Sequence, residues 1–209
     1  MTLRRLYYSF PTLHELPYFV PPGLFWRQRA ATALTREVVG QELIEGKILE
    51  IGCGSGFLSQ RMANMLSSKT IYGIDASGAM ISYAAARNRA KNLRFLVLDF
   101  LEIGTSVLTS ERFAAIVSLN VWPFFPLEES LRVVKQVSSH GTRFVAVTYC
   151  RTNWSRFHRG VLSSLFRRPL YIHEPAEFLS ALSKFGFQGT YIPIDRLEGS
   201  YLVSTVLVG

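Results

Sequence analysis

The sequence predicts an α/β fold: a seven-stranded, mainly parallel sheet with helices on both faces and a C-terminal antiparallel hairpin. Apolar strand-like runs alternate with helical segments from residue 47 onward, which is typical of parallel strands joined by helices. The last two apolar runs, residues 187–195 and 201–208, are separated by a link that is too short for a parallel crossover, since such a crossover needs about a dozen residues. These two strands are therefore expected to pair as a hairpin.

Each expected element has a recognisable beginning or end. The apolar run 47–51 leads into a glycine-rich loop, and residues 57–67 after the loop are typical of a helix. The second and third expected strands, residues 69–75 and 93–99, each end in an acid. Proline is suited to the first turn of a helix, so Pro175 is expected to begin one that ends near Gly186. The remaining elements are an Ala-rich helix at 78–91, a strand at 112–120, a helix at 127–139 and a strand at 142–150.

The bulk composition indicates one globular domain. The chain has 209 residues, 48% of them hydrophobic, which is enough for a well-packed core. It contains no unbroken apolar run of about 18 residues and no signal-peptide cleavage pattern, so we expect a cytoplasmic protein without a membrane-spanning helix. The two cysteines, Cys53 and Cys150, have no further cysteine at metal-ligand spacing, and the four histidines are scattered. We therefore expect neither a metal site nor a disulfide.

A formal net charge of +8 raises the question of an anionic partner. One basic group lies at the end of the expected helix 78–91, where cations are favoured and can face solvent: Arg87, Arg89, Lys91 and Arg94. A second group is concentrated in one segment and fits an RNA surface, a lipid surface or a solvated helix face: Arg151, Arg156, Arg159, Arg167 and Arg168.

The segment Glu50-Ile-Gly-Cys-Gly-Ser-Gly is the most informative motif. Gly52, Gly54 and Gly56 can adopt positive φ and let the backbone approach a nucleoside closely. The dinucleotide fingerprint G-x-G-x-x-G has its third glycine one residue later, and an acid such as Glu50 would repel a pyrophosphate. The alternative is a glycine-rich turn without a ligand.

This motif resembles motif I of the class I S-adenosylmethionine-dependent methyltransferases, which have a Rossmann-like sheet ending in an antiparallel hairpin. The resemblance spans residues from about 41 to 209 and implies that Asp75 accepts hydrogen bonds from both ribose hydroxyls and that Asp99 accepts one from the adenine amino group. Taken alone, either aspartate could be an ordinary helix N-cap. Other positions expected to border the S-adenosyl-L-methionine cofactor are Glu50, Gly52, Cys53, Gly54, Gly56, Ala76, Met80, Phe100 and Asn120.

Ligands of an open parallel sheet gather at the carboxyl ends of its strands, so the acceptor site is expected there. Residues 1–40 are predicted to form an aromatic arm and helix that act as a lid, with residues 41–209 as the cofactor-binding domain. The arm could instead only anchor the N-terminus. Arg27 is a candidate to pair with the cofactor carboxylate.

The end of the fourth strand, Ser118-Leu-Asn-Val-Trp-Pro-Phe-Phe125, carries the strongest acceptor signal. It is similar to the Asn-Pro-Pro-aromatic motif of enzymes that methylate the exocyclic amines of bases, but Val121 and Trp122 separate Asn120 from Pro123. We therefore expect Asn120 to border the methyl-transfer site and nearby aromatic residues to wall an apolar pocket. The expected pocket residues are Tyr18, Trp26, Trp122, Phe124 and Trp154.

Residues 151–174 are too long for an ordinary loop of about two to six residues and are expected to form a lid insertion. Three histidines lie in the segments expected to cover the site and are candidate general bases for a hydroxyl acceptor: His14, His158 and His173. An acidic carbon or a phenolate would need no base. The leading hypothesis is O- or C-methylation of a small hydrophobic metabolite. The alternatives are an RNA methyltransferase and a protein that binds S-adenosylmethionine without transferring its methyl group.

Overall fold

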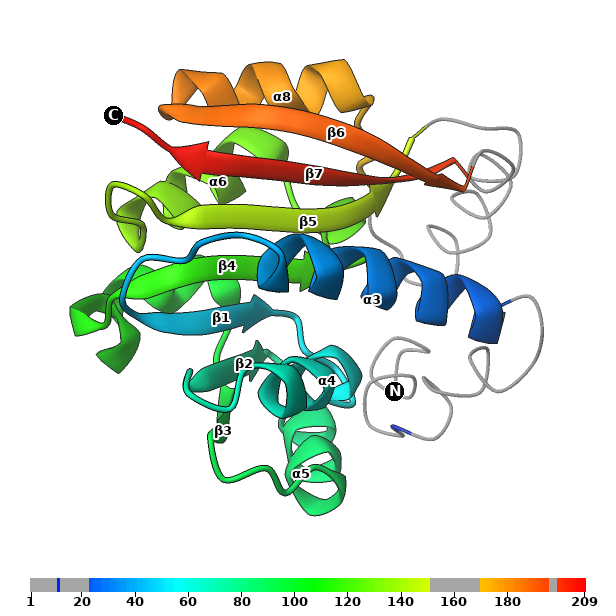
Figure 1. Ribbon diagram of the computed structural model, residues 1–209, viewed down its shortest axis with the longest axis vertical. Helices are drawn as coiled ribbons and strands as arrows, with labels where there is room; N and C mark the ends of the chain where they lie inside the picture. Colours follow the sequence, from blue (N-terminus) through cyan, green and yellow to red (C-terminus); the bar gives the residue numbers. More distant parts are fainter. Residues whose placement is uncertain (1–10, 12–22, 151–169, 196–198) are drawn as a thin grey trace.

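In the computed structural model the described residues are 11, 23–150, 170–195 and 199–209. They form one seven-stranded sheet with strand order β3-β2-β1-β4-β5-β7-β6 (Figure 1). The first three expected strands are β1 (Lys47–Ile51), β2 (Ile71–Asp75) and β3 (Leu93–Val97). Strand β2 ends at its acid as expected, whereas β3 ends two residues before Asp99. The other strands are β4 (Phe113–Leu119), β5 (Arg143–Tyr149), β6 (Phe187–Asp195) and β7 (Ser200–Leu207).

The direction of the strands confirms the expected fold class. Strands β1 to β5 are parallel to one another, whereas β7 is antiparallel to both β5 and β6. The C-terminal hairpin is therefore present. Because β7 runs against both neighbours, β6 again runs parallel to β1 to β5, and its end at Asp195 lies at the same edge as the ends of those strands.

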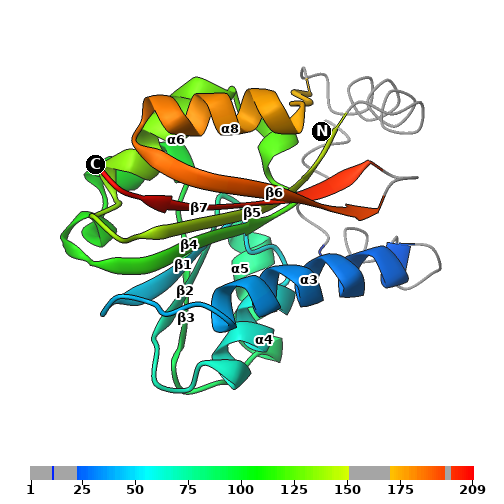
Figure 2. The same ribbon diagram turned by 45° about the horizontal axis from the view of Figure 1, so that its top comes forward.

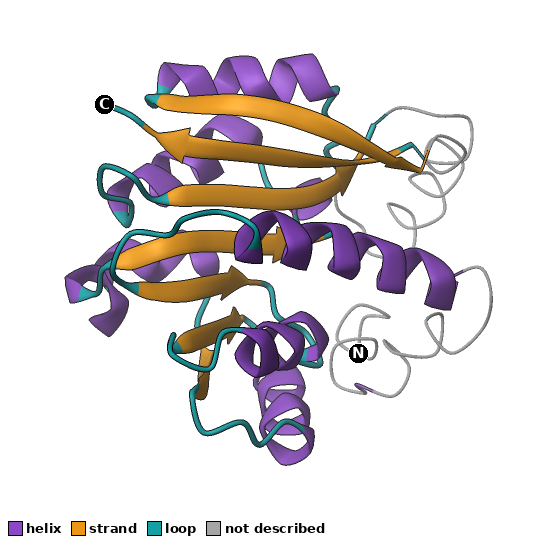
Figure 3. Cartoon of the chain, viewed as in Figure 1, coloured by secondary structure: helices purple, strands orange, loops and turns teal. Residues whose placement is uncertain are grey.

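Helices cover both faces of the sheet (Figures 2 and 3). On one face lie α3 (Gly23–Val39) and α4 (Phe57–Met65), and on the other lie α6 (Leu127–Gln136) and α8 (Pro175–Lys184). Side chains of β1 alternate between the two cores, because successive residues of a strand point to opposite faces: Ile48 packs with α3 and α4, whereas Leu49 and Ile51 pack with α6 and α8. The helix α5 (Gly78–Arg87) contacts β2 and β3.

Helix α5 ends four residues earlier than expected, at Arg87. The helix ends because the Asn88 backbone is extended (φ −118°, ψ 110°), and the Asn88 side-chain amide caps it by donating to the carbonyl of Ala84 (2.7 Å). Of the first basic group, only Arg87 lies in the last helical turn, and the C-terminal charge preference of a helix therefore does not explain Arg89, Lys91 and Arg94.

Helix α3 belongs to the core of the sheet. Its Ala30, Ala31 and Leu34 are fully buried against β4, β5 and α4. The rest of the expected arm, residues 1–10 and 12–22, and most of the expected lid insertion, residues 151–169, lie outside the described residues. In the part of the chain that the structure describes, no helix has both the length and the apolar character needed to cross a bilayer.

Candidate functional site

The glycine loop joins β1 to α4 at the carboxyl edge of the sheet. Gly52, Gly54 and Gly56 all have left-handed φ values, of 65°, 52° and 75°. A Cβ on Gly52 would lie 2.5 Å from Cγ2 of Val121, and one on Gly56 would lie 2.6 Å from Cζ of Phe95. Glycine is therefore required at these two positions by backbone conformation and by the close approach of β3 and of the segment after β4.

Asp75, the last residue of β2, fixes this loop. Its Oδ2 accepts a hydrogen bond from the backbone N–H of Gly54 (3.0 Å), and its Oδ1 accepts one from Ser77 N–H (2.9 Å). Ser77 in turn caps α5, because its Oγ accepts from Met80 N–H (3.2 Å). A carboxylate has about four lone-pair positions, so these contacts leave acceptor capacity for ribose hydroxyls.

Glu50 lies beneath the loop and is only 2% exposed. The hydroxyl of Ser59, in the first turn of α4, donates a hydrogen bond to Glu50 Oε2. Burial raises the pKa of Glu50 to about 8, against the lowering effects of Ser59 and the Arg27 guanidinium, and the nearby Asp75 carboxylate raises it further. The same burial raises the pKa of the adjacent Cys53 thiol well above its usual value, so the loop thiol is neutral near pH 7.

Arg27 and Trp26, neighbours on α3, have different surroundings. The Arg27 guanidinium donates from Nη2 to Ser55 Oγ (2.8 Å) and lies 4.2 Å above the Phe57 ring, so it reaches the glycine loop. Trp26 is 5% exposed and stacks on Tyr149 at the end of β5, with ring centroids 5.2 Å apart. The indole Nε1–H of Trp26 is buried and donates no hydrogen bond to any of the described residues.

The positions expected near adenine divide into edge and core residues. Asp99 and Ala76 are exposed at the carboxyl edge, and Asp99 Oδ1 accepts from Leu101 N–H (3.0 Å) as the N-cap of η2 (Phe100–Thr105). The N-cap role that the sequence allowed for Asp99 is therefore real, and it leaves further lone pairs at the site. Phe100 and Met80, by contrast, are 3% and 1% exposed and pack inside the protein.

Asn120 follows β4 with a φ of 60°, an unusual conformation for a residue other than glycine. Its N–H donates to Val147 O (2.8 Å), which holds the end of β4 to β5. Its Oδ1 is buried and accepts no hydrogen bond from any residue that the structure describes. A buried acceptor in this state costs about 1–3 kcal/mol and fits a site that receives a donor from a ligand.

Trp122 and Phe124, the two expected pocket-wall residues after Asn120, differ in burial. Trp122 begins the short helix η4 (Trp122–Phe124) and is 1% exposed. Its ring packs edge-on against Phe144 (5.4 Å) and Phe178 (5.2 Å), and its Nε1 donates to Ser118 Oγ (2.7 Å). The structure thus places Trp122 in the hydrophobic core and not in a pocket wall, because its ring is enclosed by Phe144, Phe178 and the other residues of that core. Phe124 is 38% exposed.

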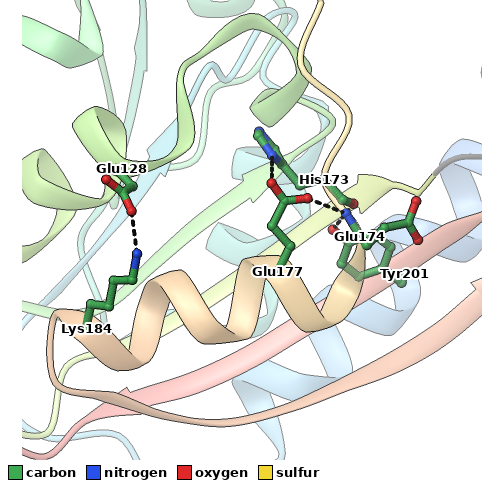
Figure 4. A network of polar contacts seen from close by, with 6 residues as sticks. All are labelled: Glu128, His173, Glu174, Glu177, Lys184 and Tyr201. Atoms are coloured by element: carbon green, nitrogen blue, oxygen red, sulfur yellow. Dashed lines mark hydrogen bonds and ion pairs between the residues drawn. The ribbon is translucent and has the colours of Figure 1, made fainter.

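His173 is buried just before α8, beside the end of β5 (Figure 4). Its Nδ1 lies 3.6 Å from Oε1 of Glu177, and its carbonyl accepts from the Tyr201 hydroxyl (2.8 Å). Tyr171 N–H donates to Pro123 O (2.8 Å), which brings this segment next to η4 and the Asn120 end of β4. Of the other expected residues, His14, His158, Tyr18 and Trp154 lie outside the described residues.

Sequence reasoning missed several residues that build the site. Ser59 holds Glu50, Val121 faces Gly52, and Asn88 donates to Ser55 O (2.9 Å) and so joins α5 to the loop. Ser59 had a detectable signal, because a small polar residue in the first turn after the loop lies over the end of β1. The other two contacts join segments more than 30 residues apart and leave no local pattern.

The donors and acceptors present fit S-adenosylmethionine. The carboxyl groups of Glu50 and Asp75 and the buried Asn120 Oδ1 are acceptors that suit the hydroxyl, amino and sulfonium groups of this cofactor, and the Arg27 guanidinium suits its carboxylate. The described ranges contain no cluster of three His, Cys, Asp or Glu side chains that could hold a metal ion.

Comparisons with known proteins agree with this geometry. A family model described as a methyltransferase domain matches residues 45–168. A malonyl-[acyl-carrier protein] O-methyltransferase of Paenibacillus sp. (strain JDR-2) is 27% identical over 169 residues, which cover 75% of this chain and 60% of that relative. The matched part of the chain thus spans 60% of that relative's length, slightly less than two thirds.

Two solved structures share the fold. The magnesium protoporphyrin IX methyltransferase of Synechocystis PCC 6803 superposes with a TM-score of 0.72 at 17% sequence identity. The superposed region covers 98% of this chain and 97% of the chain of that enzyme. The N-methyltransferase NodS of Bradyrhizobium japonicum WM9 gives a TM-score of 0.70 at 17% identity, with 91% of each chain covered. Together with the family match over more than half of its length, these findings show that the chain belongs to the class I S-adenosylmethionine-dependent methyltransferases.

Proposed function

We propose that the protein transfers the methyl group of S-adenosylmethionine to oxygen or carbon of a small hydrophobic acceptor. The observation that carries this proposal is the glycine loop tied to the Asp75 carboxylate above the buried Glu50, because it combines close backbone approach with acceptors for a cationic nucleoside. The similar proteins include an O-methyltransferase of malonyl-[acyl-carrier protein] and a C-methyltransferase of geranyl diphosphate, which supports transfer to oxygen or carbon.

The residues at the carboxyl edge have separate roles in this proposal. Asp75 accepts from the ribose hydroxyls, Asp99 from the adenine amino group, and Arg27 pairs with the carboxylate of the methionine part. When bound, the cofactor supplies a methyl group on a positively charged sulfur for in-line displacement. Asn120 Oδ1 accepts from a donor group at the methyl-transfer end, and Phe124 is an exposed apolar surface beside it.

His173 is the candidate general base for a hydroxyl acceptor. Glu177 lies within reach of its Nδ1 and favours a proton there, which orients the ring, and imidazole titrates near neutral pH. His173→Gln is expected to lower kcat at least tenfold for a hydroxyl acceptor while leaving the Kd of S-adenosylmethionine within twofold. Unchanged kcat with a hydroxyl acceptor would refute His173 as the general base. His14 and His158 stay predictions of the same kind.

The test is transfer of a labelled methyl group. The protein is incubated with methyl-tritiated S-adenosylmethionine and, in separate reactions, short carboxylic acids, phenols, prenylated small molecules, total RNA or anionic lipid vesicles. Label in a small molecule supports the proposal. Label in RNA would favour the RNA alternative instead. Binding of the cofactor without transfer to any acceptor would favour a protein that only binds it.

A further inference from the structure

Glu50 is an acid buried without a full counter-charge. Glu50 is 2% exposed, and its carboxyl group accepts a side-chain hydrogen bond from the Ser59 hydroxyl. A carboxylate in such a place loses the solvation of water and needs either a cation or a proton. The charged groups that surround Glu50 decide whether its carboxyl group is ionised beside a cation or carries a proton.

Three elements present titratable groups to Glu50. Arg27 of α3 is the cation, but its guanidinium donates to Ser55 Oγ and lies on the Phe57 ring, so its charge reaches Glu50 only through space. Asp75 of β2 adds a second negative charge and so opposes ionisation of Glu50. Cys53 of the loop is a buried thiol that stays neutral. Among the described residues, Arg27 is therefore the cation that lowers the pKa of Glu50, and Asp75 opposes it.

This balance favours the neutral form of Glu50 in the free protein. Burial is the largest cause and raises the pKa of Glu50 to about 8, so that most molecules carry the proton at pH 7. A ligand with a net positive charge would reverse the balance, since an opposite charge within about 4–6 Å favours the carboxylate.

We propose that Glu50 loses its proton when the methyl donor binds, becomes the counter-ion of the donor's positive charge, and thereby selects the cationic donor over its neutral demethylated product. This inference rests on the proposed function, because it requires S-adenosylmethionine as the ligand. The O–H bond of the carboxyl group breaks, the proton passes to the buffer and no other bond changes. S-Adenosylhomocysteine lacks the sulfonium charge and stabilises the carboxylate less, which favours release of the product after transfer.

The experiment is titration calorimetry of the whole protein with S-adenosylmethionine in buffers of different ionisation enthalpy. If the Glu50 proton is lost on binding, the wild-type protein releases about 0.9 proton more than Glu50→Gln at pH 7. This difference falls to about 0.1 proton at pH 9, where Glu50 is already ionised in the free protein. The same linkage predicts that the wild-type affinity rises about 25-fold from pH 6.5 to 8.5 relative to the variant. The variant sees the same ligand, so titration of the ligand's own amino group cancels.

Three controls separate this role from a structural one. Glu45→Gln removes an exposed acid close in sequence and is expected to behave as wild type. Ser59→Ala removes the hydrogen bond that favours the carboxylate, so the midpoint of the affinity profile is expected to move to higher pH. S-Adenosylhomocysteine is expected to release less proton than S-adenosylmethionine from the wild-type protein.

Equal proton release by the wild type and Glu50→Gln would overturn the inference, and so would equal release on binding of the donor and of its product. Neither result bears on the proposed function, because methyl transfer requires the donor to bind but does not require Glu50 to change its protonation state. Failure of S-adenosylmethionine to bind the wild type at any pH would instead refute the proposed function itself.

Discussion

Asp75→Ala is the substitution that tests the cofactor site most directly. Asp75 closes β2 and accepts backbone hydrogen bonds from Gly54 (3.0 Å) and Ser77 (2.9 Å). The substitution therefore acts twice: it releases the glycine loop from β2, and it removes the proposed acceptor of the ribose hydroxyls. The two effects differ in size and in the measurement that detects them.

The stability effect follows from the two backbone contacts. A hydrogen bond to a charged group contributes about 1.5–3 kcal/mol, and water partly replaces it at a half-buried carboxylate, so both together contribute about 2–3 kcal/mol. For a chain of this length that loss lowers Tm by about 5–10 °C. Loss of two ribose contacts of about 1.5 kcal/mol each weakens S-adenosylmethionine binding about 100-fold.

Thermal unfolding and titration calorimetry measure the two effects separately. Asp75→Asn is the matched control, because its amide oxygen can keep one of the two backbone contacts and should recover about half of the lost stability. A folded Asp75→Ala protein whose Kd for S-adenosylmethionine stays within twofold of the wild-type value would refute the assignment of Asp75 to the ribose.

Three further predictions concern the loop, the core and the buried acid. Gly52→Ala should lower the free energy of unfolding, measured in urea, by about 2 kcal/mol or more. Adding Val121→Ala should recover only the part of this loss that comes from contact between the new Cβ and Val121, because the left-handed φ remains. If the double variant recovers no stability, that contact is not a cause of the loss. Trp122→Ala should cost about 3–5 kcal/mol in the same assay, since its ring fills the core, whereas a pocket-wall residue would lower activity and leave stability nearly unchanged. The pKa of Glu50 is about 8 in the folded protein and 4.5 in the unfolded chain. The stabilisation that Glu50 gives the folded protein is therefore complete below pH 4.5, and it is lost at about 1.4 kcal/mol per pH unit as the pH rises to about 8. Glu50→Gln should therefore gain stability relative to the wild type across that window, and parallel pH profiles of Tm would contradict the buried neutral acid.

Local sequence patterns were sufficient for the elements and for the cofactor motif. The strand expected at 187–195 has those bounds, and the hairpin with β7 follows from the short link, because a chain of that length cannot cross the sheet. The glycine spacing predicted positive φ at Gly52, Gly54 and Gly56, and all three adopt it. Boundaries were less accurate, since α5 ends where Asn88 folds back onto Ala84 O.

The position of Trp122 could not be derived in the same way. A tryptophan after a strand at the ligand-binding edge is equally suited to a pocket wall and to the core. The space between Phe144 and Phe178 places its ring in the core, and those two residues come from β5 and α8.

The sequence by itself determined the fold class, the strand and helix order and the kind of cofactor, because these depend on short-range periodicity, turn chemistry and the spacing of a few residues. The tertiary structure alone decided the strand order 3-2-1-4-5-7-6 and the state of Glu50. The pKa of that carboxyl group depends on burial beneath α4 and on Arg27 and Asp75, more than 20 residues away on either side. Electrostatic energy depends on distance and solvation in three dimensions, and neither quantity is present in the order of the residues.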